Sequence, residues 1–308
     1  MQSTNTVLMV RPAAFSYNEQ TAGNNSFQEK GYEQNAQANA LKEFDNYVKL
    51  LTGAGVNVII AEDTPEPHTP DSIFPNNWFT THSADELDAG GSTLVLYPMN
   101  APNRRLERDK NVLQALEDAG KTFRQVIDLT HFEAEGKFLE GTGSLILDRK
   151  NRIAFCCASP RTHEDVLEEW AELLDYEYFL FNAADEDGTP IYHTNVMMCV
   201  GVKFAFVCLD AITGLDERER LIEILEENGK EIIEITFEQM HRFAGNMLVV
   251  KNGKGEVVLV LSATAKASLL PEQLEKLTRH YRTILSPELS YIEKNGGGSA
   301  RCMLAEIF

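Results

Sequence analysis

The chain repeats one order of secondary-structure signals five times, and this repetition restricts the folds that it can adopt. Apolar residues at three- and four-residue spacing predict five helices, which begin near Asn39, Arg104, His163, Asp216 and Pro271. The helix starts lie about 53 to 65 residues apart, and most helices follow a pair of β-rich runs and precede another such run. A strand–strand–helix–strand unit at this period predicts an α/β repeat architecture closed on itself, although two α/β domains with coincidental spacing would give the same layout.

The bulk composition narrows the class of partner. The 308 residues carry a formal net charge of −19, which argues against nucleic acid and anionic membrane surfaces, because both require cationic faces. The opening residues lack the features of a signal peptide, and no segment reaches the length of a membrane helix. Four of the five cysteines lie in apolar runs such as IAFCCA, which is typical of reduced thiols, so we expect a cytoplasmic protein.

Residues that packing does not explain are concentrated in seven segments between the predicted elements. They are FPNNWFTTH (74–82), NRRLER (103–108), FLEGTGS (138–144), SPRTHED (159–165), YHTN (192–195), FAGN (243–246) and GGGSARC (296–302). Loops on a rigid scaffold commonly carry the chemistry of an enzyme. These segments contain a cysteine behind glycines, a histidine after an aromatic residue and a glutamate beside glycines. This is the residue set of a thiol nucleophile with its acid–base partners.

The order of these motifs resembles the guanidine-group-modifying superfamily of arginine deiminases, dimethylarginine hydrolases and amidinotransferases. The shared strings are FPN…FT, R-R-x-E, EG-x-G, SPRT, H-x-N and GGGSARC, over about residues 74–308. The opening RPAAFSYNEQTAGNNSFQ resembles the entrance loop of amidinotransferase-like bacterial members. This resemblance implies an α/β pentein fold, which is a five-bladed β/α propeller with pseudo-five-fold ββαβ repeats. It also implies a single catalytic domain over residues 1–308.

The resemblance implies a catalytic role for three residues. Cys302 corresponds to the nucleophile, and the glycines before it let the backbone turn the thiol toward the substrate. His193 corresponds to the general acid–base group, since an imidazole titrates near working pH. Glu140 corresponds to the carboxylate that holds the substrate nitrogens. A structural thiol, a structural histidine and a solvated turn acid are the alternatives, and Arg301 would favour the thiolate only if its side chain points inward.

Three further residues correspond to those that bind the amino-acid carboxylate in arginine deiminases. They are Asn76, Arg104 and Arg161, with Arg105 as a stand-in for Arg104. Paired arginines suit this task because a guanidinium binds a carboxylate through two parallel N–H groups. The alternative interpretation is that Arg104 and Arg161 are surface arginines that cap helix starts.

The positions for the other end of the substrate depart from the family pattern. Arginine deiminases bind the cationic guanidinium with aspartates, whereas the corresponding positions here are His82, Asn195 and Gly143. Each lost carboxylate removes about 4 kcal/mol of attraction at about 4 Å and an effective dielectric of about 20. Asn195 offers a donor and an acceptor, and His82 can donate to a carbonyl, which together suit a neutral urea. This pattern points to citrulline. The strings FPNNWF, FAGNM and GGGSARCMLAEIF also resemble those of the bacterial citrulline-utilisation hydrolases of this superfamily.

We therefore expect a cysteine hydrolase that converts the ureido group of citrulline to ornithine, CO2 and ammonia through a covalent thioester. No metal or organic cofactor is implied, and the expected partner is a small-molecule amino-acid substrate. An arginine deiminase or (acyl)arginine dihydrolase is the first alternative, an amidinotransferase is the second, and a non-catalytic binding protein is the least favoured. Two questions stay open at this point: whether the chain forms a homodimer, and whether the polar loop of residues 16–28 closes over the site.

Overall fold

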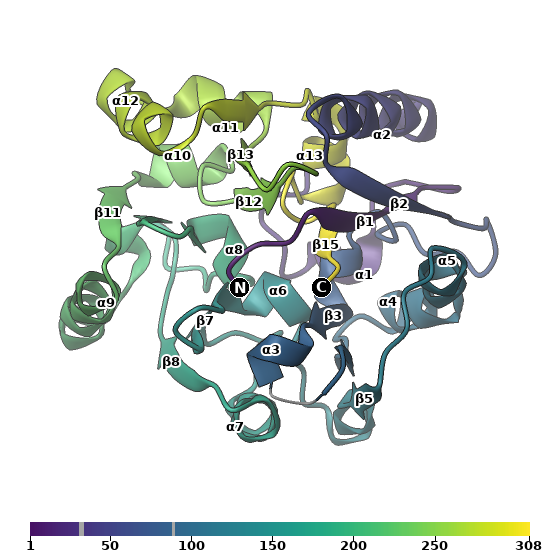
Figure 1. Ribbon diagram of the computed structural model, residues 1–308, viewed down its shortest axis with the longest axis horizontal. Coiled ribbons are helices and arrows are strands. Elements are labelled where there is room, and N and C mark those ends of the chain that lie inside the picture. Colours follow the sequence, from purple (N-terminus) through teal and green to yellow (C-terminus); the bar gives the residue numbers. More distant parts are fainter. Residues whose placement is uncertain (31–33, 88–89) are drawn as a thin grey trace.

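Five small sheets form the framework of the molecule (Figure 1). The computed structural model describes residues 1–30, 34–87 and 90–308. Within these residues the sheets have three strands each, in the orders β15-β1-β2, β3-β4-β5, β6-β7-β8, β11-β10-β9 and β12-β13-β14. In every sheet the middle strand pairs antiparallel with one neighbour and parallel with the other. The α/β class expected from the sequence is therefore confirmed.

The elements have the following bounds. The strands are β1 Thr6–Arg11, β2 Asn57–Glu62, β3 Phe79–His82, β4 Thr93–Leu96, β5 Gln125–Asp128, β6 Ile146–Asp148, β7 Ile153–Cys157, β8 Glu177–Phe181, β9 Met198–Val200, β10 Phe204–Val207, β11 Glu231–Glu234, β12 Leu248–Lys251, β13 Val257–Val260, β14 Thr283–Leu285 and β15 Ala305–Glu306. The α-helices are α1 Glu19–Ala22, α2 Ala36–Gly53, α3 Ala84–Leu87, α4 Pro102–Arg105, α5 Val112–Asp118, α6 Gly141–Ser144, α7 Glu164–Leu174, α8 Thr194–Met197, α9 Leu215–Glu227, α10 Phe237–His241, α11 Ala263–Ser268, α12 Pro271–His280 and α13 Ser290–Gly296. Short 3-10 turns are η1 Pro75–Asn77, η2 Leu106–Asp109, η3 Thr130–Glu135 and η4 Leu209–Ala211.

An outer helix connects the two parallel strands of each sheet. The helices α2, α5, α7, α9 and α12 make these connections and lie at the periphery of the molecule, whereas the sheets surround its centre (Figure 1). The first sheet takes its third strand from the end of the chain, because β15 pairs antiparallel with β1. Both termini therefore lie near the centre of the view (Figure 1). This pairing also anchors the chain immediately after Cys302.

The helix predicted from Arg104 is broken in the structure into α4, the turn η2 and α5. The break falls at Lys110, whose backbone is extended. Its Nζ donates to the backbone oxygens of Thr64 and Pro67 at 2.6 and 2.7 Å and forms a buried ion pair with Asp63 at 3.1 Å. These tertiary contacts outweigh a local helical pattern, because helix propensity is a weak preference.

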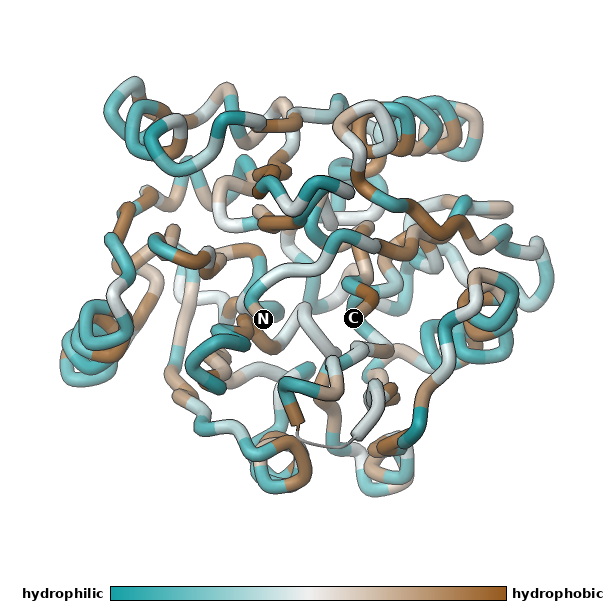
Figure 2. Tube along the Cα trace, viewed as in Figure 1, coloured by the Kyte–Doolittle hydropathy of each residue, from teal (hydrophilic) through white to brown (hydrophobic). Residues whose placement is uncertain are grey.

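Apolar side chains fill the space between the sheets and the outer helices in four clusters. The largest fully buried side chains include Trp78, Trp170, Tyr47 and Tyr97. Hydrophilic residues cover much of the outward side of the peripheral helices, and hydrophobic residues lie on the strands and on inward helix faces (Figure 2). Within the described part of the chain, no helix has the length and apolar character needed to cross a bilayer.

Candidate active site

Cys302 lies in the turn between α13 and β15, and only 5% of its surface is exposed. The backbone conformation explains one glycine of the run that precedes Cys302. Gly297 has a φ of +62°, in the left-handed region that favours glycine, and a Cβ there would lie 2.6 Å from the side chain of Asn25. The chain can therefore turn sharply beneath the loop that carries Asn25 and direct the following residues toward the centre of the molecule.

His193 and Glu140 form a buried hydrogen-bonded pair. His193 directly precedes α8, and its Nε2 lies 2.8 Å from Oε2 of Glu140, the residue before α6. Oε1 of Glu140 accepts a hydrogen bond from the backbone N–H of Asn100 at 2.9 Å. Burial lowers the pKa of His193 to about 4, although Glu140 opposes this shift. Burial would raise the pKa of Glu140, but Arg161 and His193 lower it to about 2, so the pair is a neutral imidazole beside a carboxylate.

One small cavity contains both the sulfur and the imidazole. Its lining residues are Asn25, Asp71, Phe74, Asn77, Arg104, Arg161, Tyr192, His193, Gly296, Gly297, Gly298 and Cys302. The cavity volume is about 20 Å³, which is enough for about one water molecule. Since an amino acid is much larger than this, part of the wall has to move before such a molecule can enter.

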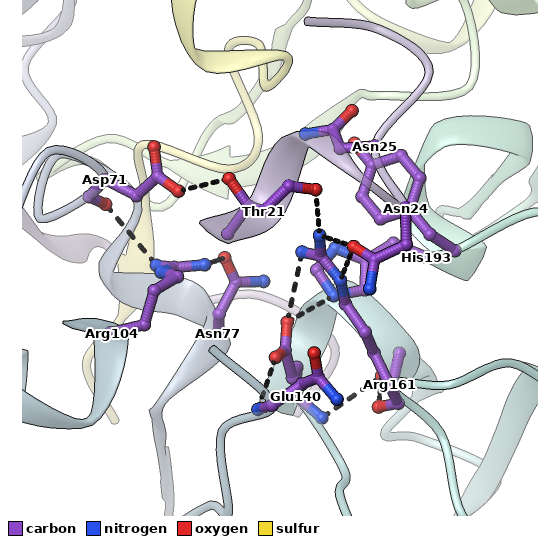
Figure 3. A network of polar contacts seen from close by, with 12 residues as sticks. Thr21, Asn24, Asn25, Asp71, Asn77, Arg104, Glu140, Arg161 and His193 are labelled. Carbon is purple, nitrogen blue, oxygen red and sulfur yellow. Dashed lines mark hydrogen bonds and ion pairs between the residues drawn. The ribbon is translucent and has the colours of Figure 1, made fainter. Parts of the chain in front are cut away.

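Arg104 orients a side-chain amide at this cavity (Figure 3). Its Nε and Nη2 donate to the two carboxylate oxygens of Glu107 at 2.8 and 3.0 Å, and its Nη1 donates to Oδ1 of Asn77 at 2.7 Å. Because Arg104 can only donate, Oδ1 of Asn77 must face it, and Nδ2 of Asn77 is left buried without a partner. Glu107 thus occupies the fork of Arg104 that was expected to bind a carboxylate. The expected stand-in, Arg105, instead donates to the backbone oxygen of Met99.

The guanidinium of Arg161 faces the cavity and is engaged by the polar loop near the N-terminus (Figure 3). Its Nε donates to Oδ1 of Asn24 at 3.0 Å, and Nη2 donates to the same oxygen and to the backbone oxygen of Thr21. The guanidinium also stacks on the ring of Tyr192, with 4.8 Å between the carbon and the ring centroid. An amide oxygen thus occupies the edge of Arg161 that is suited to a carboxylate.

The same loop engages the buried carboxylate of Asp71, which also lines the cavity (Figure 3). Oδ2 of Asp71 accepts hydrogen bonds from Nδ2 of Asn18 at 2.8 Å and from Oγ1 of Thr21 at 3.1 Å. Its Oδ1 is buried without a partner. Residues of the segment 18–28 therefore satisfy part of the polar wall of the cavity.

Four residues expected at the site do not line the cavity, namely Asn76, His82, Glu140 and Asn195. Asn76 donates from Nδ2 to Oγ1 of Thr142 at 3.4 Å, and its neighbour Asn77 faces the cavity instead. His82 is fully buried elsewhere, with Nδ1 at 2.8 Å from Oε1 of Glu86 and Nε2 at 2.9 Å from Oγ1 of Thr80. The expectation that His82 donates to the substrate is thus corrected: its ring nitrogens are used inside a separate polar cluster.

Asn195 was expected at the substrate, and its amide lies against the sulfur. Its Nδ2 donates to the backbone oxygen of Thr142 at 3.2 Å and to Sγ of Cys302 at 3.5 Å, while its Oδ1 is buried without a partner. Arg301 does not point toward the sulfur. Its Nη1 donates to the backbone oxygen of Leu304, and Nη2 lies 3.9 Å from Glu306.

The comparisons with known proteins agree with this fold. Residues 11–308 match the family model described as N,N dimethylarginine dimethylhydrolase, eukaryotic. The chain belongs to the N,N-dimethylarginine dimethylhydrolase family. It is thereby a member of the pentein superfamily of guanidino-modifying hydrolases. No curated protein sequence matches the chain significantly.

Solved structures of low sequence identity share the fold of this dimethylarginine dimethylhydrolase family member. The N-terminal domain of ArgZ, covalently bound to a reaction intermediate, has a TM-score of 0.74 and 19% identity, covering 98% of this chain and 97% of that chain. ArgZ is described as an arginine dihydrolase from the ornithine–ammonia cycle in cyanobacteria. AgrE with ornithine and NAD+ has a TM-score of 0.73 and 17% identity, covering 98% of this chain but 39% of that chain. The dimethylarginine dimethylhydrolase of Pseudomonas aeruginosa, crystallised as a Cys-to-Ser mutant with citrulline, has a TM-score of 0.65 and 15% identity. The match covers 99% of this chain and 100% of that chain.

The cavity of this family member has a distinctive charge pattern. Asp71 is the one carboxylate among the described residues that line it, whereas Arg104 and Arg161 are both present. Gly143 leaves room for both Asn77 and His193, because a Cβ there would collide with Nδ2 of Asn77 and lie 2.7 Å from the ring of His193. Among the described residues, no group of three or more His, Cys, Asp and Glu side chains is arranged to hold a metal ion.

Three residues of this site were not identified from the sequence as binding groups. Asn77 was passed over because two asparagines follow one another in FPNNW, and the periodicity does not show which one faces inward. Asp71 lies in a segment, TPDSIF, that reads as an ordinary turn. For Asn246 in FAGN the sequence is equally consistent with a pocket-lining residue and with a turn former, and in the structure its amide contacts Sγ of Cys302 at 3.2 Å.

Proposed function

We propose that this chain is a cysteine hydrolase of the ureido group of citrulline, with ornithine, carbon dioxide and ammonia as products. The observation that carries the proposal is the set of groups around the sulfur, which are amides and a neutral imidazole. A guanidinium is cationic, and each facing carboxylate would add about 4 kcal/mol of attraction at about 4 Å before desolvation. In the part of the chain that the structure describes, Asp71 is the one carboxylate that lines the cavity, and its Oδ2 already accepts hydrogen bonds from Asn18 and Thr21.

The buried atoms without partners match the groups of citrulline. Nδ2 of Asn77 is a donor suited to the ureido carbonyl, and Oδ1 of Asn195 is an acceptor suited to a ureido N–H. Oδ1 of Asp71 is an acceptor suited to a free α-ammonium group. A buried polar atom without a partner costs free energy, so a ligand that satisfies all three would recover that cost on binding. Arg161 would bind the carboxylate once Asn24 has been displaced from its fork.

The first half of the reaction uses Cys302 and His193. Neutral His193 accepts the thiol proton, and the sulfur of Cys302 forms a bond to the ureido carbon. The negative charge moves to the carbonyl oxygen, where Nδ2 of Asn77 can donate to it. The bond from the carbon to the δ-nitrogen then breaks, and His193 gives its proton to this nitrogen. Ornithine leaves, and a carbamoyl thioester stays on Cys302.

The second half of the reaction consumes one water molecule. His193, now neutral, accepts a proton from water as the oxygen bonds to the carbonyl carbon of the thioester. The carbon–sulfur bond breaks, the thiol is restored by the proton on His193, and carbamate is released. Carbamate then decomposes to carbon dioxide and ammonia. Glu140 holds the imidazole through its 2.8 Å hydrogen bond and stabilises the imidazolium in both halves.

An arginine dihydrolase is the second candidate, and one observation favours it. ArgZ is described as an arginine dihydrolase, and ArgZ and AgrE both share this fold over nearly the whole chain. An enzyme of that kind must also process a neutral intermediate, so the amides around Cys302 would suit it as well. An acylarginine dihydrolase is less favoured, because the free oxygen of Asp71 fits an unmodified α-ammonium group. A deiminase is less favoured because, among the described residues, Asp71 is the one carboxylate that lines the cavity.

A substrate panel tests the proposal. Purified protein is given citrulline, arginine, N-acylarginine or agmatine, and ammonia, ornithine and citrulline are quantified. We expect ornithine and ammonia from citrulline, with no turnover in Cys302→Ala and full turnover in the matched control Cys208→Ala. Ornithine from arginine as well would favour the dihydrolase. Turnover of arginine alone, with citrulline untouched, would reject the proposal.

We further propose that the five sheets are the blades of a five-bladed β/α propeller and that residues 1–308 act as one catalytic domain in the cytoplasm. The arrangement of the sheets around the centre supports the propeller (Figure 1). The pairing of β15 with β1 supports a single domain, because it joins the two ends of the chain within one sheet. A small-molecule amino-acid substrate is the proposed partner.

A further inference from the structure

Asn246 connects the nucleophile to the backbone on which it is mounted. It lies in the turn between α10 and β12 and is fully buried. Its Nδ2 donates to Sγ of Cys302 at 3.2 Å and to the backbone oxygen of Asn195 at 3.0 Å. Its Oδ1 accepts the backbone N–H of Arg301 at 3.0 Å. One side chain therefore contacts the sulfur and the peptide just before it.

These partners determine the orientation of the amide. A backbone N–H can only donate, so the atom that faces Arg301 must be the oxygen of Asn246. The NH2 group must then face the sulfur of Cys302 and the carbonyl of Asn195. A donor aimed at a sulfur favours the thiolate over the thiol, because the hydrogen bond is stronger when the acceptor is charged.

The other groups near the sulfur do not supply this contact. In the described part of the chain, the hydrogen bonds to Sγ of Cys302 come from the amides of Asn246 and Asn195, at 3.2 and 3.5 Å. Nε2 of His193 is engaged by Glu140, and the guanidinium of Arg301 donates to the backbone oxygen of Leu304. The shorter of the two contacts to the sulfur is therefore that of Asn246.

The turn that presents Asn246 has an unusual backbone. Phe243 has a φ of +62°, which is uncommon for a bulky residue. Its backbone oxygen accepts the N–H of Asn246 at 2.9 Å, and its ring packs on Phe27 with 5.1 Å between centroids. Strained residues of this kind persist where the surroundings hold them, and they are concentrated at functional sites.

We propose that Asn246 is a catalytic residue that holds Cys302 in place and favours its thiolate form. This inference rests on the proposed role of Cys302 as the nucleophile. In the reaction above, the donor of Asn246 stabilises the sulfur both before attack and when the carbon–sulfur bond breaks. Asn195 supplies a second, longer contact to the same sulfur.

Several ionisable groups also surround Cys302 and act on its charge. Those that line the same cavity are His193, Asp71, Arg104, Arg161 and Tyr192. Arg301, the preceding residue, and Tyr47 also interact with it electrostatically. All of them are unchanged in a variant of Asn246, so a difference between the variant and the wild type reports on the amide itself.

The test is the pH dependence of alkylation of Cys302 by iodoacetamide, measured by mass spectrometry of its peptide. The variant Asn246→Asp keeps the acceptor for Arg301 and replaces the donor with a negative oxygen facing the sulfur. We expect the midpoint of the profile to rise by about one pH unit or more, with a fall of about tenfold or more in the rate at pH 7. The variant Asn246→Ala, which adds no charge, is expected to shift the midpoint upward by a smaller amount.

A second measurement distinguishes this role of Asn246 from a purely structural role. Thermal unfolding is measured for Asn246→Ala in the wild type and in the Cys302→Ala background. If Asn246 only supports the fold, the loss of stability is the same in both and the alkylation midpoint does not move; that outcome overturns the proposal. If Asn246→Asp does not fold, the midpoint of Asn246→Ala decides. Alkylation requires no substrate turnover, so failure of citrulline hydrolysis leaves this test intact.

Discussion

At the scale of single residues, chemistry at this site depends on which atom of each amide faces the cavity or the sulfur. Arg104 holds Oδ1 of Asn77, and the backbone N–H of Arg301 holds Oδ1 of Asn246. In both cases a group that can only donate directs the opposite NH2 group inward. An asparagine mounted in this way is a neutral donor with a defined direction, which a carboxylate at the same position cannot be.

The difference between an amide and a carboxylate gives a prediction for Asn77. The variant Asn77→Asp keeps the acceptor for Arg104 but places an anionic oxygen where the ureido carbonyl would lie. We expect kcat/KM for citrulline to fall by about tenfold or more relative to that for arginine, because the carboxylate repels a carbonyl and attracts a cation. The measurement is the ratio of the two kcat/KM values.

The neighbouring asparagine provides the matched control for this prediction. Asn76 carries the same side chain but does not line the cavity, so Asn76→Asp should leave the arginine-to-citrulline ratio close to that of the wild type. An equal change of the ratio in both variants would contradict the direct contact proposed for Asn77.

The same residues explain how far the sequence could predict the site. Cys302, His193 and Glu140 lie in distinctive strings, and the structure brings them together: two line the cavity, and the third is hydrogen bonded to His193. Their roles stay predictions. In FPNNW the choice between Asn76 and Asn77 depends on one residue of register in a 3-10 turn, which no pattern reveals. His82 was assigned to the wrong environment, although Glu86, four residues later, was a signal for a local pair between the end of β3 and α3.

At the scale of elements, the loop of residues 18–28 packs against charged residues that line the cavity. It contacts both Asp71 and Arg161 with amide and hydroxyl groups, and the cavity beneath it holds about one water molecule. A substrate that binds Arg161 must therefore displace Asn24. The free energy needed to break those hydrogen bonds weakens the apparent binding of the substrate.

This competition gives a prediction for the loop. In Asn24→Ala the fork of Arg161 is no longer occupied by the loop, so we expect KM for citrulline to fall by about twofold to tenfold. Steady-state kinetics provide the measurement, with Ser26→Ala as the control, because Ser26 is exposed on the same loop. A rise of KM in Asn24→Ala alone would show that Asn24 binds the substrate instead of competing with it.

The elements also show where local patterns give way to tertiary contacts. Four of the five predicted outer helices form as single helices, because an amphipathic pattern that faces a core is a strong signal. The segment after Arg104 is different, since Lys110 reaches the oxygens of Thr64 and Pro67 and leaves the helical path. Such an interaction joins residues more than 40 positions apart and leaves no trace in the local sequence pattern.

At the scale of the whole molecule, closure of the chain on itself positions the nucleophile. Cys302 lies between α13 and β15, and β15 is held by β1 at the other end of the sequence. Along the chain, Glu140 comes before β6 and His193 comes after β8, so the two residues flank the sheet β6-β7-β8 in sequence. The repeat order in the sequence predicted an architecture closed on itself, but the exchange of a terminal strand depends on pairing that only the folded chain shows.

The most direct test of the account is the chemical identity of the group that citrulline leaves on Cys302. The protein is mixed with citrulline, quenched in acid during turnover, digested and analysed by mass spectrometry. We predict a carbamoyl group on the peptide that contains Cys302 and on none of the peptides with the other four cysteines. Hydrolysis of citrulline with no adduct on Cys302, and with undiminished activity in Cys302→Ser, would contradict the central claim.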